Sequence, residues 1–98
     1  MTLKMQAFTN VWDALEPDPV IRANLKLRSA LMRAITQWVE ASGYTQKEAA
    51  AVLGTTQPRL NNVLKGKIDR CTIDRLVNML EAAGQHVSFN LAKVVTAA

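Results

Sequence analysis

The chain has 98 residues, of which 49% are hydrophobic and 20% are charged, and its formal net charge is +4. These values exclude a disordered protein, because disordered chains have low hydrophobicity. They predict one domain with a modest buried core. The single cysteine, Cys71, excludes an internal disulfide, and the single histidine, His86, leaves no set of metal ligands or proton-transfer residues. We therefore expect no enzyme, no metal site and no cofactor. The excess of positive charge favours an anionic partner.

The sequence shows no signal for export or for membrane insertion. No uninterrupted apolar stretch approaches the roughly 18 to 20 residues of a membrane span. Residues 1–6 lack a basic start that leads into a continuous apolar run. We expect a cytoplasmic protein without a membrane partner.

Prolines and glycines divide the chain into five helix-like segments and a tail. Residues 1–18 are expected to form an N-terminal arm with a short helix over 8–15, which ends before Pro17. Asp18 caps a longer helix that begins at Pro19 and ends near residue 41. Apolar residues recur along this helix at intervals of three to four positions: Leu27, Leu31, Ile35 and Trp38.

Two short helices follow, separated by a tight turn. Thr45 and Glu48 form a capping box, which places a helix start directly after Thr45. Gly54 allows the left-handed backbone of a sharp turn. Thr56 caps the next helix, and Pro58 falls within its first turn, where proline is tolerated. The residues expected to face the core are Ala49, Val52 and Leu53 in the first helix and Leu60, Val63 and Leu64 in the second.

The last helix leads into a segment with a different period. Thr72 caps the helix and Gly84 closes it, with a buried face of Ile73, Leu76, Val77 and Leu80. Residues 85–98 form a C-terminal strand and tail, because Val87, Phe89 and Leu91 alternate with polar residues. Two interpretations stay open for the strand: it pairs with its twin in a second copy as a dimer contact, or it packs over its own core.

The second short helix has an unusual outer face. Its outward residues carry amides and cations, and no acidic residue occurs between Gly54 and Ile68. An α-helix fits the major groove of B-DNA, which is about 12 Å wide, and phosphate repels carboxylates. The segment from Thr45 to Gly66 is therefore predicted to be a DNA-binding helix-turn-helix.

This segment resembles the helix-turn-helix of the phage-repressor-like (XRE, Cro-type) regulators. The residues that match are Thr45-Gln46, Ala50, Leu53-Gly54, Thr56-Gln57, Leu60, Val63, Leu64 and Gly66. The resemblance implies an all-α, phage-repressor-like domain of five helices, with the helix-turn-helix domain over residues 19–84, followed by the short C-terminal β-strand. A narrower similarity, to the HigA-like antitoxin branch, is carried by the runs 53–60, 64–68 and 76–80.

The resemblance also implies roles for individual side chains. Residues that reach base edges would be Gln57, Pro58, Arg59 and Asn62. Pro58 has no donor, so it can only contact a thymine methyl or shape the helix. Residues that contact phosphates would be Gln46, Thr56, Asn61, Lys65 and Lys67. Such regulators bind palindromic operators as two-fold dimers, which makes Val87, Phe89 and Leu91 the candidate dimer contact.

The resulting prediction is a sequence-specific transcriptional repressor that binds double-stranded DNA. The HigA-like similarity implies the antitoxin and autorepressor of a toxin–antitoxin pair, with a toxin protein as a second partner. One alternative is a free-standing XRE-type regulator without a toxin. The other is a protein-interaction module that keeps the fold and has lost DNA binding.

Overall fold

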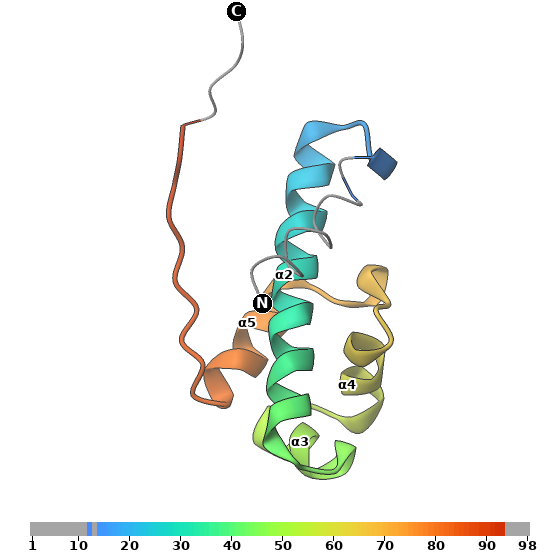
Figure 1. Cartoon of the computed structure of the whole chain (residues 1–98), viewed down its shortest axis with the longest axis vertical. Coiled ribbons are helices and arrows are strands. Elements are labelled where there is room, and N and C mark those ends of the chain that lie inside the picture. The colour runs from blue at the N-terminus through green and yellow to red at the C-terminus, as the bar shows by residue number, and fades with distance from the viewer. Residues whose placement is uncertain (1–11, 13, 94–98) are drawn as a thin grey trace, which may run out of the picture.

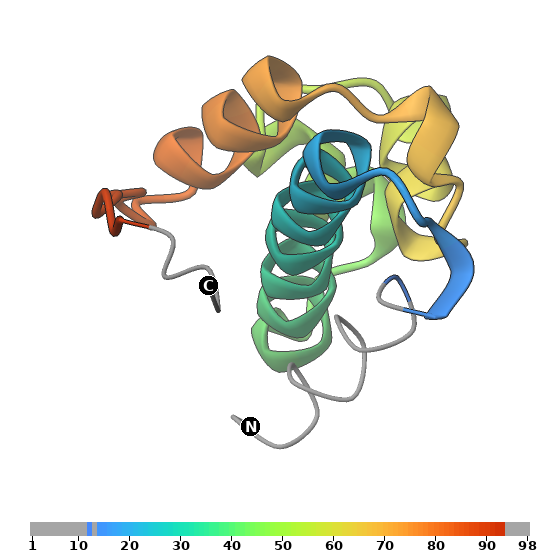
Figure 2. The ribbon, with the colours of Figure 1, turned by 90° about the horizontal axis from the view of Figure 1, so that it is seen from above.

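A computed structural model describes Trp12 and residues 14–93. Within that part the helices are α2 (Pro19–Ser42), α3 (Gln46–Val52), α4 (Gln57–Leu64), the 3-10 helix η1 (Ile68–Arg70) and α5 (Ile73–Ala82). The long helix α2 runs through the middle of the molecule, with α5 on one side and α4 and η1 on the other, while α3 lies near the C-terminal end of α2 (Figures 1 and 2). Most of the helix expected over 8–15 lies outside the described residues.

Helix α2 begins and ends where the sequence predicts. The Asp18 carboxylate accepts hydrogen bonds from the backbone N–H groups of Val20 and Ile21, at 2.8 and 3.2 Å. Gly43 ends the helix with a φ of +73°. Leu27, expected on the buried stripe, is 50% exposed, so this expectation was wrong. The buried residues of α2 begin only at Ser29, because the other helices cover mainly its second half.

The centre of the core holds four large apolar side chains, which come from α2, from the residue directly after α3, from α4 and from α5. Ile35, Leu53, Leu60 and Leu76 are each at most 1% exposed. Burying a side chain of this kind contributes about 1.5 to 3 kcal/mol. Val52 was expected on this buried face, but it is 38% exposed. The inward face of α3 instead consists of the small residues Ala49 and Ala50 with Leu53 at its end, and small residues allow helices to approach closely.

The two tryptophans both pack on the domain. The indole N–H of Trp12 donates to the hydroxyl of Ser29 at 2.6 Å, and Ser29 is fully buried in α2. Trp38 is partly buried against the core, as expected, and its ring lies 6.0 Å from the ring of Tyr44. The first contact ties the segment before α2 to the body of the domain.

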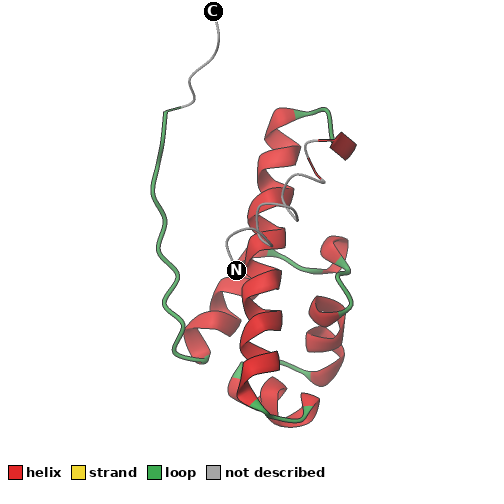
Figure 3. Cartoon of the chain, viewed as in Figure 1, coloured by secondary structure: helices red, strands yellow, loops and turns green. Residues whose placement is uncertain are grey.

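The expected C-terminal strand is not formed in the described residues. Residues 85–93 are loop, and Figure 3 shows no strand in this part of the chain. Val87 packs against the core, whereas Phe89 and Leu91 are each 87% exposed. A strand is defined by backbone pairing with a neighbour, and the described chain offers it none. The alternation of side chains predicted a strand, but within the described part of a single chain this segment has no backbone partner with which to pair.

Candidate nucleic-acid interface

The turn between α3 and α4 fixes the angle between the two helices. Thr45 and Glu48 form the expected capping box: the Thr45 N–H donates to the Glu48 carboxylate at 2.9 Å, and the Glu48 N–H donates to the Thr45 hydroxyl at 3.2 Å. The hydrogen bond that the Glu48 carboxylate accepts from the Thr45 backbone N–H is the main cause that holds the pKa of Glu48 below its ordinary value. At the other end of α3, Gly54 has a φ of +66°. The Thr55 N–H then bonds back to the Ala50 carbonyl at 3.0 Å, which closes the turn.

Helix α4 divides into a buried face and an accessible face. Leu60 and Val63 are buried, whereas Leu64 is partly buried. Of the residues expected to reach bases, Gln57, Pro58 and Arg59 are exposed and Asn62 is half-buried. The structure therefore leaves the first turn of α4 open to a ligand, while its inner face belongs to the core.

Several of the expected phosphate contacts also have structural roles. The Gln46 side-chain amide donates to the Asn61 side-chain oxygen at 3.4 Å, which links the start of α3 to the middle of α4. The Thr56 hydroxyl accepts the N–H of Arg59 at 3.3 Å and so caps α4. Lys65 and Lys67 are exposed beyond the end of α4. Gln46 and Asn61 thus lie together on the flank of α4 that faces α3.

The loop after α4 is held to the body of the domain. Arg28 of α2 donates a hydrogen bond from Nη1 to the carbonyl of Ile68 at 3.1 Å. The thiol of Cys71 is buried and donates to the carbonyl of Lys67 at 3.3 Å. Burial raises the pKa of the Cys71 thiol. The side chains of Lys65 and Lys67 therefore project from an anchored loop.

The opposite flank of α4 carries a group of three arginines, of which the sequence pattern indicated only Arg59. Arg59 lines a hollow between α4 and α5 together with Arg70 of η1 and Arg75 of α5. A second hollow beside it is also lined by Arg59 and Arg75. These residues lie 11 and 16 positions after Arg59 in the chain, so only the fold brings them together.

The arrangement of α3, the turn at Gly54 and the exposed first turn of α4 is that of a helix-turn-helix unit. A family model described as a helix-turn-helix domain matches residues 17–91, and the chain belongs to this family. No curated protein matches the chain. Helix-turn-helix domains place their second helix in the major groove, so the family supports a DNA-binding regulator.

Two further structural findings bear on function. No helix in the described part of the chain is both long enough and apolar enough to cross a membrane. Among the same residues, no cluster of three or more His, Cys, Asp or Glu side chains is placed to hold a metal ion.

Proposed function

We propose that this protein is a sequence-specific transcriptional repressor that binds a palindromic operator with α4 in the major groove. The observation that carries the proposal is the accessible face of α4. Gln57, Pro58 and Arg59 are exposed there, and the chain has no carboxylate from Thr55 to Lys67. Amides and guanidinium groups are the side chains that bond adenine and guanine edges, and a surface without carboxylates can approach phosphate.

In this proposal the side chains of the interface have two kinds of task. Base edges are contacted by Gln57, Pro58, Arg59 and Asn62. Phosphates are contacted by Gln46, Thr56, Asn61, Lys65 and Lys67. The Gln46–Asn61 hydrogen bond supports this division, since it fixes two amides on one flank of α4 before DNA arrives. Preorganised side chains lose less conformational entropy when they bind.

The division is tested by comparing Asn62→Ala with Lys65→Ala. The Asn62→Ala variant should lose about 1 to 3 kcal/mol at the preferred site and little on random DNA, because a base contact carries sequence information. The Lys65→Ala variant should weaken binding to all sequences, because a phosphate contact carries no sequence information. It should also lower the slope of log affinity against log salt by about one unit. Fluorescence anisotropy over a salt series, with upstream intergenic DNA and a random duplex, measures both.

A uniform loss for Asn62→Ala would remove this residue from the base-reading set. An unchanged salt slope for Lys65→Ala would remove Lys65 from the interface. Absence of salt-dependent binding by the unmodified protein to either duplex would instead favour the protein-interaction module.

We further propose that the protein is an XRE-type, HigA-like antitoxin that represses its own operon and binds a toxin protein. The support is the sequence similarity over 53–60, 64–68 and 76–80. Val20, Ile21 and Leu27 are each at least 50% exposed on the first half of α2, which offers a partner an apolar surface. The antitoxin role predicts an adjacent gene for a small basic protein that copurifies with this chain and arrests growth when expressed alone. If no such neighbour exists, the protein is a free-standing regulator.

A further inference from the structure

Three arginines form what we call the arginine cluster: Arg59 of α4, Arg70 of η1 and Arg75 of α5. All three are exposed, and they line one hollow between α4 and α5. Its other lining residues are Thr55, Val63, Cys71, Leu76 and Met79, none of which is acidic. The nearest carboxylates along the chain, Asp69 and Asp74, line a different hollow, which they share with Asn24 and Arg28.

The positive charge of the arginine cluster is not neutralised within the described part of the chain. The side chains of Arg59, Arg70 and Arg75 make no hydrogen bond or ion pair there. Like charges that share a small surface repel one another and oppose folding. An anionic ligand should therefore stabilise this surface, because it relieves the repulsion among three unpaired guanidinium groups.

The position of two of these arginines increases the local positive potential. The N–H of Arg59 donates to the Thr56 cap of α4, and the N–H of Arg75 donates to the Thr72 cap of α5, both at 3.3 Å. Both arginines thus lie in the first turn of a helix, at the positive end of its dipole, where a cation is unfavourable and an anion is favourable. Two helix starts and three guanidinium groups lie around the same part of the surface.

From this placement we propose that the arginine cluster binds backbone phosphates of the DNA duplex alongside α4, so that the interface extends from the groove onto η1 and α5. This inference rests on the proposed DNA-binding function. Arg59 borders both surfaces, so Arg70 and Arg75 are the residues specific to the extension. Guanidinium groups match phosphate geometry by bidentate hydrogen bonding, which favours phosphate over a diffuse acidic surface.

The test is the double variant Arg70→Gln/Arg75→Gln, with Arg22→Gln/Lys26→Gln on α2 as the control that removes the same charge. Affinity for upstream intergenic DNA and for a random duplex is measured by fluorescence anisotropy over a salt series. Each phosphate contact contributes about 0.9 to the slope of log affinity against log salt, so the Arg70/Arg75 variant should lose about two units. Its preference for one duplex over the other should not change, and the control should keep the slope of the unmodified protein.

The outcomes separate this inference from the proposed function. If Asn62→Ala loses sequence preference but the Arg70/Arg75 variant keeps the full salt slope, the DNA-binding function stands and the extension is wrong. An unchanged salt slope is also expected if the cluster binds an acidic protein in place of DNA, and that outcome equally overturns the proposal. If the unmodified protein binds neither duplex, the function and the extension fail together. The midpoint temperature of thermal unfolding should not be lower for the Arg70/Arg75 variant than for the unmodified protein, because the substitutions remove charge repulsion without removing a contact.

Discussion

At the scale of single residues, Gly54 determines how α4 is presented. Its φ of +66° lies in the left-handed region, and a Cβ built on it would meet only the Cβ of Ala82, at an ordinary distance of 3.8 Å. The requirement for glycine is therefore one of backbone conformation and not of space. A substitution at Gly54 therefore changes the turn that sets the orientation of α4, without a steric clash in the core.

We expect Gly54→Ala to lower the free energy of unfolding by about 1 kcal/mol or more, since an L-residue is strained at positive φ. Gly54→Asn should cost less, because asparagine tolerates this conformation better than other side chains. Urea unfolding of both variants measures the difference. Equal losses for alanine and asparagine would show that the added side chain, and not the backbone, is the cause.

Residues that act through local geometry could be predicted from sequence alone. Asp18, Thr45, Thr56 and Thr72 all accept the cap hydrogen bonds expected of them, since a cap depends on only three or four neighbouring positions. The exposure of Leu27 and Val52 could not be predicted in this way. Both are apolar at helical spacing, and their environment depends on where the other helices pack. The arginine cluster was missed for the same reason.

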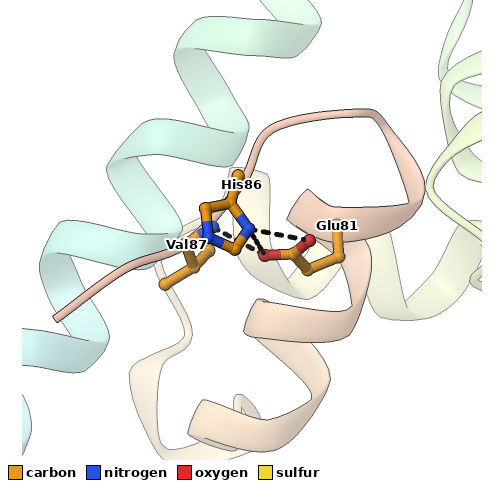
Figure 4. Close-up of polar contacts among 3 residues, drawn as sticks. All are labelled: Glu81, His86 and Val87. Atoms are coloured by element: carbon orange, nitrogen blue, oxygen red, sulfur yellow. Dashed lines mark hydrogen bonds and ion pairs between the residues drawn. The ribbon is translucent and has the colours of Figure 1, made fainter.

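At the scale of elements, the last turn of α5 holds the start of the tail. A carboxylate oxygen of Glu81 accepts the backbone N–H of Val87 at 2.6 Å and lies 3.1 Å from Nδ1 of His86 (Figure 4). These interactions, that with Val87 foremost, hold the pKa of Glu81 below its ordinary value of 4.5. The carboxylate therefore sets the direction in which the chain leaves α5, where the sequence pattern predicted only an alternating strand.

The contact of Glu81 with the tail should depend on pH. A carboxyl group whose pKa is lowered by folding stabilises the folded form above its unfolded pKa, and this contribution is lost as the pH falls through the folded value. We expect the Val87 amide to be protected from hydrogen exchange above pH 4.5 and to lose protection as the pH falls below it. The Glu81→Gln variant should show reduced protection throughout, while Glu48→Gln, in the α3 cap, should leave Val87 unchanged. A Val87 amide signal that does not respond to pH would contradict this role.

At the scale of the whole molecule, a single copy of this domain offers DNA only one α4. One recognition helix reads a few base pairs, and regulators of this type gain specificity by binding two half-sites about one helical turn apart. The exposed Phe89 and Leu91 lie on an extended segment within the matched family domain, which ends at residue 91. Unpaired backbone beside exposed apolar side chains is suited to pairing with the same segment of a second copy.

We therefore expect a homodimer in which the two tails pair through Phe89 and Leu91, with Val87 joining each tail to its own core. The double variant Phe89→Ser/Leu91→Ser should be monomeric in sedimentation experiments and should still unfold cooperatively, because both side chains are exposed in the single chain. It should lose only the concentration-dependent part of the thermal stability, which comes from dimerisation. Val87→Ser is the matched control, and it should lower stability because Val87 packs against the core. The monomeric variant should bind a single half-site as the unmodified protein does, but it should lose the gain from a second half-site, since the two α4 helices are no longer linked. A protein that sediments as a monomer both free and on operator DNA would show that the tail has another role.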